Sequence, residues 1–202
     1  NKEDVDYFVF PYNTGPVFSS RKVKKIVVVH DLIFMRSRSE LPLSMSLYQT
    51  LGRYYRCFIV PRVVRKADLI VTVSEFTKSE LIEKFKIPAD DIVVIPNSIG
   101  NEWYSERVPL SDREPYLFTV AGEAPSKNVP NLLRGFALAR GHLDTNIKLR
   151  IAGIKATHHS FFIASARKLG IESQVDFLGF LSEQELQVQY RNARAFIFAS
   201  LF

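Results

Sequence analysis

The chain has 202 residues, of which 47% are hydrophobic and 24% charged, so it can build one large domain or two small ones with a sizeable core. Its net charge of +6 is spread along the sequence, which favours anionic small ligands or a headgroup surface over a nucleic-acid groove, and ordinary solubility explains the excess more simply. No apolar run reaches the length of a membrane span, and the single cysteine, Cys57, excludes an intrachain disulfide and fits a reducing, cytoplasmic compartment.

Short β-branched runs recur along the sequence, with helical segments between most of them. These runs are apolar at consecutive positions, which is typical of parallel strands whose two faces are both covered by helices. The predicted strands cover residues 26–30, 69–74, 92–97, 117–122, 149–153, 175–179 and 195–200. This alternation indicates α/β architecture, in which ligands bind at the carboxyl ends of the strands.

Residues 44–66 predict a helix with a broad apolar face and a basic surround. The apolar positions are Leu47, Leu51, Tyr54, Tyr55, Phe58 and Ile59, and the basic ones are Arg53, Arg56, Arg62, Arg65 and Lys66. Pro61 should break or kink this helix. We expect a core helix with a solvated edge, and the alternative is a helix that lies on an anionic membrane surface.

Three further helices have clear sequence signals. Ser74 is placed to cap a helix that starts at the next residue. Ser182 and Glu185 form a capping box before another helix. A third helix has its apolar face at the i, i+3, i+4 and i+7 positions Val129, Leu132, Leu133 and Phe136. The polar stretch 98–115 has no periodicity and is predicted to link two α/β units.

The stretch 116–140 combines a strand, a glycine turn at Gly122, a lysine at Lys127 and a helix start at 128–130. Near a glycine, backbone N–H groups can approach an anion, a helix N-terminus adds partial positive charge, and the lysine adds a full charge. The sequence therefore predicts a phosphate-binding loop here. The alternative is an ordinary βα loop with one solvated lysine.

Other binding motifs are missing. The sequence lacks G-x-G-x-x-G after any strand, the P-loop pattern G-x-x-x-x-G-K-[ST], and the hydrolase motif G-x-S-x-G. A lone cysteine without H-E-x-x-H leaves no strong zinc site. His158 and His159 are adjacent, so on a helix they point about 100° apart and cannot easily chelate one ion. We expect them on the surface near a helix start, and we expect neither a metal nor a cofactor.

Six segments together resemble the middle of a family 4 glycosyltransferase, in the order and at the spacing of that family. They are VVVHDLIF, RKADLIVTVSEFTKSEL, IVVIPNSI, FTVAGEAPSKNVPNLLRGF, LRIAG and VDFLGFLSEQELQVQYRNARAFIFAS. The resemblance runs from about Lys25 to the end. It implies the GT-B architecture, with two Rossmann-like domains facing a cleft and both incomplete in this chain. Residues 1–100 would belong to the acceptor-side domain, 101–115 to the linker, and 116–202 to the nucleotide-sugar domain.

The resemblance also assigns roles to single residues. Gly122 and Lys127 fall on the family's phosphate loop, where Lys127 would stabilise the departing donor diphosphate. Ser126 stands where the family usually carries a second cation. His30 matches a histidine beside the transferred sugar, so His30 and Lys127 are the expected catalytic residues. Phe177 and Gly179 would line the base pocket mainly through backbone.

Glu185 matches a family glutamate in the donor site, although the capping box already explains it. Asn97 matches the end of the strand that enters the linker, but Ser98 and Ile99 replace the usual residues after it.

The implied reaction is transfer of a hexosyl group, with mannosyl transfer included, from a nucleotide-sugar to a polysaccharide or lipid-linked acceptor. It would proceed with retention, as in lipopolysaccharide, O-antigen or capsule biosynthesis, in the cytoplasm or peripherally on its membrane face, without nucleic acid. The alternatives are an inverting transferase or epimerase of the same architecture, and a truncated, non-catalytic nucleotide-binding or scaffold fragment.

Two family segments fall outside the sequence. The family's acidic motif would start after Phe202, and its glycine-rich acceptor loop would precede the first residue. The opening NKEDVDYFVFPY also lacks an initiator Met and a signal peptide. We therefore expect the sequence to be the middle of a longer chain.

Overall fold

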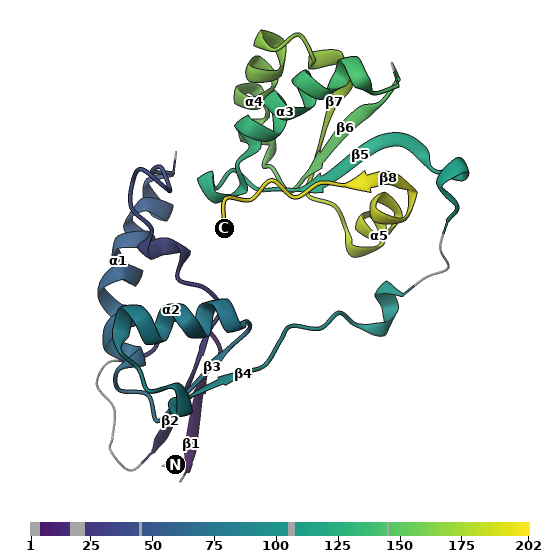
Figure 1. Ribbon diagram of the computed structural model, residues 1–202. Coiled ribbons are helices and arrows are strands. Elements are labelled where there is room, and N and C mark those ends of the chain that lie inside the picture. Colours follow the sequence, from purple (N-terminus) through teal and green to yellow (C-terminus); the bar gives the residue numbers. More distant parts are fainter. Residues whose placement is uncertain (1–4, 17–22, 45, 105–107, 145) are drawn as a thin grey trace. The chain divides into compact units, whose positions relative to one another are not determined.

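The computed structural model describes residues 5–16, 23–44, 46–104, 108–144 and 146–202 (Figure 1). The chain divides into two compact units, unit 1 (Asn1–Ile99) and unit 2 (Gly100–Phe202). Each unit contains a four-stranded sheet in which every strand pair is parallel. The α/β prediction is therefore confirmed.

Unit 1 places its strands in the order β1-β2-β3-β4. The strands are β1 (Tyr7–Phe10), β2 (Lys24–Val29), β3 (Leu69–Thr72) and β4 (Ile92–Val94), and the helices are α1 (Leu47–Val64) and α2 (Glu75–Phe85). β1 was not predicted from the sequence. It is an edge strand with three exposed residues out of four, although its sequence YFVF is apolar at consecutive positions like the predicted strands.

Both helices of unit 1 pack on the same face of its sheet. The core joins Val27, Val29, Ile70 and Ile92 of the strands to Val60, Val63, Leu81 and Phe85 of the helices. Since alternate strand residues point to opposite faces, Ile26, Val28 and Val71 lie on the other face, where they are only half-buried. The prediction that helices cover both faces is therefore wrong for the described part of unit 1.

Helix α1 continues through Pro61 to Val64, so of the expected break or kink the break is wrong. Pro61 lacks the N–H that would bond one turn back. On either side of it, Val60 and Val63 are buried against the sheet, which keeps this part of the chain helical.

The apolar face predicted for α1 does not point into the core. Four residues spaced i, i+4, i+7 and i+11 are exposed, and we call them the outer stripe: Leu47, Leu51, Tyr54 and Phe58. The expectation of a core helix is wrong for this face, because the valines near the end of the helix make the core contacts. Arg53 is not on a solvated edge either, since its guanidinium donates to the carbonyls of Phe34, Leu41 and Arg36.

Unit 2 orders its strands β7-β6-β5-β8. Its elements are β5 (Glu114–Val120), α3 (Val129–Ala139), β6 (Lys148–Ala152), α4 (Ala156–Lys168), β7 (Val175–Gly179), α5 (Glu183–Asn192) and β8 (Ala193–Phe196). Helices α3 and α4 cover one face of the sheet and α5 covers the other (Figure 1). Burial of both faces is confirmed for this unit.

The predicted helix caps are confirmed. Ser74 Oγ accepts the Thr77 N–H at 3.2 Å at the start of α2. At the start of α5, Ser182 and Glu185 form the predicted capping box, and the Ser182 N–H donates to the Glu185 carboxylate at 2.7 Å. This backbone hydrogen bond is the main cause that lowers the pKa of Glu185. Its carboxylate is therefore committed to holding the first turn of α5.

The segment between the units is less irregular than predicted. It contains 3-10 turns at Asn101–Trp103 and Leu110–Asp112, and β5 already begins at Glu114, inside the predicted linker 101–115. Among the helices in the described ranges, none is both long and apolar enough to cross a bilayer.

Gly153, directly after β6, is expected to be the glycine least tolerant of a side chain. Its φ is +92°, and an added Cβ would lie 2.9 Å from the carbonyl oxygen of Ala121. We expect Gly153→Ala to lower the free energy of unfolding by about 1–3 kcal/mol, measured by urea denaturation. Gly135→Ala in α3 is the matched control, because a Cβ there meets nothing within 4 Å. The control should gain about 0.5–1 kcal/mol, and equal stability of the two variants would contradict the prediction.

Candidate functional site

The loop between β5 and α3 is a short, tightly turned segment. A 3-10 turn covers Pro125–Lys127, and the Lys127 N–H donates to the Ala124 carbonyl at 2.9 Å. Asn128 then takes the left-handed conformation, with φ 56° and ψ 33°, and α3 begins at the next residue. An asparagine tolerates this backbone region better than most side chains. Lys127 therefore ends the 3-10 turn, and Asn128 connects it to α3.

Residues 199–201 of the carboxyl-terminal segment are hydrogen-bonded to this loop. The Asn128 side-chain amide donates to the Ala199 carbonyl at 3.0 Å. The carbonyl of Ser126 accepts two hydrogen bonds, from the Leu201 N–H at 2.8 Å and from the Ser200 hydroxyl at 3.0 Å. The position of Lys127 thus depends on residues more than 70 positions away in sequence.

Lys127 is the cation of this loop. Its Nζ lies 5.2 Å from the centroid of the Phe198 ring, and no described residue gives it a hydrogen bond or an ion pair. The ring packs beside the ammonium without neutralising it. Pro130 carries no N–H, so the start of α3 offers an anion fewer donors than a standard helix end. Most of the positive charge available to a ligand here belongs to Lys127.

A second charged group in the loop is already paired. The Glu123 side chain is 10% exposed and lies 3.7 Å from Lys155 Nζ and 3.9 Å from His158 Nδ1. No motif in the sequence marks Glu123, because only the fold brings Lys155 and the start of α4 beside it. His158 and His159 are half-buried in α4, and His159 Nε2 bonds to the Ile154 carbonyl at 2.9 Å. Both histidines lie near the helix start, as expected, but they are half-buried rather than fully on the surface.

The carboxyl ends of β5, β6 and β7 are bonded into one edge. The Ala121 N–H donates to Ala152 at 2.9 Å, and the Gly153 N–H donates to Gly179 at 2.6 Å. Gly122 and Gly179 therefore lie along the same edge of the sheet. Gly122 does not have a positive φ, and a Cβ there would make only an ordinary 3.8 Å contact. On this edge the backbone requires glycine at Gly153 and at Gly179, whose φ angles are +92° and +70°. The place of Gly153 directly after the strand LRIA was an unused sequence signal.

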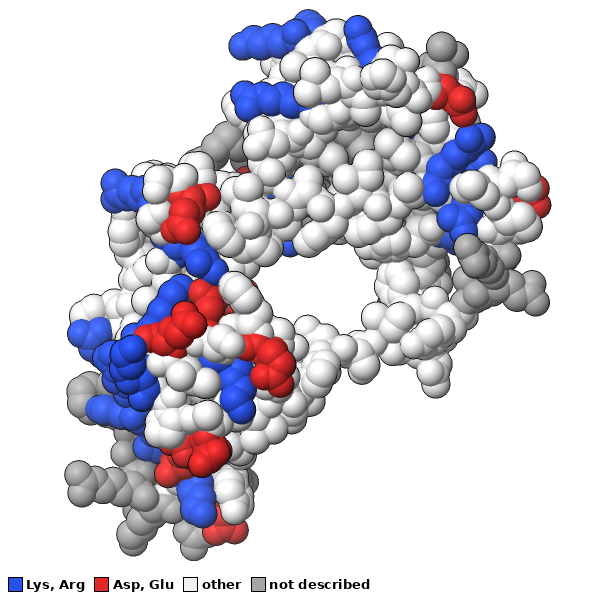
Figure 2. Space-filling model, viewed as in Figure 1, with Lys and Arg blue, Asp and Glu red and all other residues white. Residues whose placement is uncertain are grey.

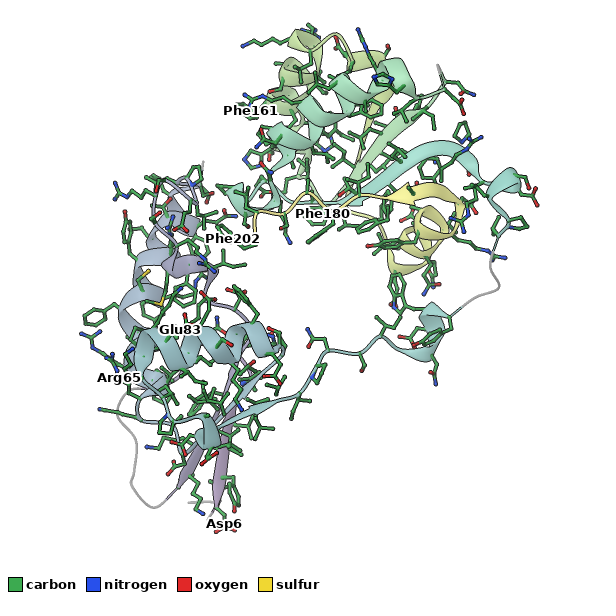
Figure 3. The ribbon with its side chains drawn as sticks, in the orientation of Figure 1. Asp6, Arg65, Glu83, Phe161, Phe180 and Phe202 are labelled. Atoms are coloured by element: carbon green, nitrogen blue, oxygen red, sulfur yellow. The ribbon has the colours of Figure 1, made fainter. Side chains whose placement is uncertain are left out.

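The remaining donor-site candidates have structural partners. The centroid of the Phe177 ring lies 6.3 Å from that of Phe162 and 5.6 Å from that of His159, so the ring packs inside unit 2. Phe180, by contrast, is 71% exposed (Figure 3). Glu185 is engaged by its capping box on the α5 side of the sheet. Ser126 lies in the loop itself, next to Lys127.

His30 belongs to unit 1, where it follows β2 directly. Its N–H donates to Asn13 Oδ1 at 2.9 Å, and its Nε2 lies 3.0 Å from the Pro11 carbonyl. A carbonyl only accepts, so Nε2 carries a hydrogen and Nδ1 of the neutral ring is left as an acceptor. The His30 side chain is exposed. Its backbone N–H and its backbone carbonyl are both hydrogen-bonded, because the Thr77 hydroxyl donates to the carbonyl at 3.3 Å. His30 is therefore not a packed core histidine.

No cluster of three or more His, Cys, Asp and Glu side chains suited to a metal ion occurs in the part of the chain that the structure describes.

The conformation of Asn128 leads to a graded prediction. Asn128→Gly keeps the left-handed turn but loses the bond to Ala199, whereas Asn128→Ala loses both. We expect the alanine variant to be less stable than the glycine variant by about 1 kcal/mol in urea unfolding, because an L side chain strains this backbone region. If the alanine variant were as stable as the glycine variant, Asn128 would not be held in this conformation in solution.

Two family models match the chain. The model described as Glycosyltransferase Family 4 matches residues 6–102, and the model described as Glycosyl transferases group 1 matches residues 102–202.

Relatives of known type are similar over much of the chain. The O-antigen chain mannosyltransferase B of Escherichia coli is 25% identical over 145 residues, which are 67% of this chain and 38% of that protein. The serotype-specific mannosyltransferase WbdA of Escherichia coli is 26% identical over 193 residues, which are 88% of this chain and 23% of that protein. The chain therefore spans well under half of the length of these relatives.

Solved structures share the fold. The apo form of the lipopolysaccharide outer core galactosyltransferase WaaB has a TM-score of 0.57 and 24% identity, over 87% of this chain and 50% of that one. Anabaena Alr3699/HepE in complex with UDP and glucose has a TM-score of 0.60 and 16% identity, over 88% of this chain and 46% of that one. These similarities identify the fold of the two units as that of GT-B glycosyltransferases. Because the two family models cover both units in turn, the chain belongs to the family 4, group 1 glycosyltransferases.

Proposed function

We propose that the protein containing this chain transfers a hexosyl group, specifically mannosyl, from a nucleoside-diphosphate sugar to a glycan or lipid-linked acceptor, with retention of anomeric configuration. The observation that carries the proposal is the Lys127 ammonium, held at the carboxyl edge of a parallel sheet without an ion-pair partner among the described residues. Such an edge is where α/β proteins bind ligands. The mannosyltransferase relatives support the choice of sugar.

In the proposed reaction, unit 2 binds the donor and stabilises its leaving group. The diphosphate would lie against the 121–128 loop, where Lys127 neutralises the charge that develops on the departing oxygen. The N-terminus of α3 adds a weaker positive field. Because Ser126 is uncharged, the Lys127 ammonium is the one full positive charge of this loop that would stabilise the leaving diphosphate. The leaving oxygen and the incoming hydroxyl would share one face of an oxocarbenium-like sugar, which gives retention without a metal or a covalent enzyme intermediate.

His30 is proposed to act from unit 1. The free Nδ1 acceptor of its neutral ring is suited to a sugar hydroxyl, and the bonds to Asn13 and Pro11 hold the ring in position. We further propose a cytoplasmic location, which agrees with the free thiol of Cys57.

Removal of the Lys127 charge tests the proposal. We expect Lys127→Ala in the full-length protein to lose about 100-fold or more of the transfer rate, as for a lost oxyanion-type contact. Lys168→Ala, at the exposed end of α4, is the matched control and should transfer normally. Near-normal transfer by Lys127→Ala would contradict the assignment of the donor site.

The competing functions give different products. NMR coupling constants of the first-formed product distinguish retention from inversion, and release of an altered nucleotide-sugar without acceptor would indicate an epimerase. Nucleotide binding without transfer by the full-length protein would favour a non-catalytic binding or scaffold role.

A peripheral membrane contact is a second proposal, favoured by the outer stripe of α1. Its four residues are exposed, and α1 contains no acidic residue. The Arg62 guanidinium lies 3.5 Å above the Phe58 ring, and Arg65 follows at the end of the helix (Figure 3). Figure 2 shows Lys and Arg along one margin of unit 1, intermixed with Asp and Glu elsewhere on that face. An apolar stripe with flanking arginines fits the surface of an anionic bilayer.

Vesicle co-sedimentation tests this contact. We expect the triple variant Leu47→Ser, Leu51→Ser and Phe58→Ser to bind vesicles of mixed neutral and anionic lipid at least about tenfold more weakly than the wild type. The reason is that binding scales with buried apolar area. The matched control replaces Leu138 and Phe161, which are exposed on α3 and α4. Arg53 is unsuitable for this test because it holds three backbone carbonyls. Equal binding by the triple variant and the control would end the proposal.

A further inference from the structure

We infer that Lys155 is a positioning residue of unit 2, which holds the Glu123 carboxylate away from the Lys127 ammonium. The inference deepens the proposed function and rests on it, because Lys127 lies in the loop that would bind the donor diphosphate. Lys155 lies outside this loop, directly before α4, and no motif of the sequence marks it. It acts through Glu123 and does not itself touch the donor.

The 121–128 loop carries opposite charges at two nearby positions. Glu123 is its one acidic residue and Lys127 its one basic residue, so the charges of the loop itself cancel. The 3-10 turn Pro125–Lys127 folds the chain back between them, and both side chains are long enough to meet across one turn. An ion pair inside the loop would therefore remove the positive charge that a diphosphate needs.

The structure shows a different pairing. Glu123 Oε1 lies 3.7 Å from Lys155 Nζ and 3.9 Å from His158 Nδ1. Within the described ranges Lys127 has no ion-pair partner, and its Nζ lies 5.2 Å from the centroid of the Phe198 ring. The acid of the loop is thus paired with groups at the start of α4, and the base of the loop remains available to an anion.

The burial of Glu123 makes its choice of partner important. Its side chain is 10% exposed, and no described residue donates a hydrogen bond to its carboxylate. A carboxylate with so little access to water needs a charged partner. If the cation beside it were removed, the carboxylate would turn toward water or toward the next cation within reach. In this loop that cation is Lys127.

Lys155 contributes more to this pairing than His158 does. The Nδ1 atom of His158 is buried without a hydrogen-bond partner in the described part of the chain, and the ring is charged only when it is protonated. Lys155 instead supplies the full charge of an ammonium. Its side chain is 59% exposed, so its replacement leaves no gap in the core. Lys155 is therefore the residue to change.

The expected effect of Lys155 is on the charges of the loop rather than on folding. An ion pair with one exposed partner contributes little to the stability of a protein. Loss of Lys155 should therefore leave the urea unfolding curve nearly unchanged while it alters the properties of Lys127. A residue with a merely structural role would show the opposite result.

The test is a double-mutant cycle of Lys155→Ala and Glu123→Gln in the full-length protein. Affinity for GDP, UDP and ADP is measured by titration calorimetry. Acylation of the Lys127 amine is measured by mass spectrometry without nucleotide. We expect Lys155→Ala to weaken binding of the preferred nucleotide about tenfold, which is typical of coupled neighbours. It should slow acylation of Lys127 at least about threefold, because a new ion pair with Glu123 keeps the ammonium protonated.

The second substitution distinguishes positioning from a change in net charge. Glu123→Gln should restore both measurements when it is added to Lys155→Ala, although alone it should change either by less than about twofold. Lys155→Arg should behave as the wild type does, because it keeps the charge that holds Glu123. Lys168→Ala, at the other end of α4, is the matched control for loss of one positive charge and should change neither measurement.

Two results would overturn the inference. One is an equal effect of Glu123→Gln with and without Lys155, since independent charges act additively. The other is unchanged acylation of Lys127 in Lys155→Ala. A wild-type protein that binds none of the nucleotides would remove the proposed donor site instead. The acylation measurement then still decides whether Lys155 keeps Glu123 away from Lys127, so the two failures are distinguishable.

Discussion

The arrangement of the candidate site depends on the hydrogen bonds that join the carboxyl ends of three strands in unit 2. Ala121 bonds to Ala152, and Gly153 bonds to Gly179, so the loops after β5, β6 and β7 begin side by side. Gly153 has no room for a side chain, because its φ is positive and the Ala121 carbonyl oxygen occupies the space that a Cβ would need. From this edge the 121–128 loop extends, and the residues after β8 then bond to Ser126 and Asn128.

This arrangement leaves one charge unbalanced where a ligand would bind. Glu123, the acid of the loop, is turned toward Lys155 and His158 of α4. Lys127 keeps its charge next to an aromatic ring that cannot neutralise it. An unpaired ammonium at a sheet edge costs little folding free energy while it is hydrated, and its charge attracts anionic ligands. The same loop thus carries a paired acid, Glu123, and an unpaired cation, Lys127, that is available to a ligand.

Helix α1 has the corresponding role in unit 1, because its sides face three environments. Val60, Val63 and Val64 pack into the core, and the outer stripe faces solvent. A third face, with Tyr48, Gln49, Gly52, Tyr55 and Arg56, lines a pocket of unit 1. Arg53 fixes the helix against the loop before it through three backbone carbonyls.

The sequence by itself determined the α/β class, most strand positions, the caps at Ser74 and Ser182, and the turn that carries Lys127 between β5 and α3, because these depend on local periodicity and short-range hydrogen bonds. It could not determine which face of α1 is buried, since the apolar residues of the outer stripe have core-like composition but the valines around Pro61 meet the sheet. Likewise, the importance of Gly153, Asn128 and Glu123 arises from partners distant in sequence. Such contacts exist only once the strands have paired, so tertiary structure alone decided them.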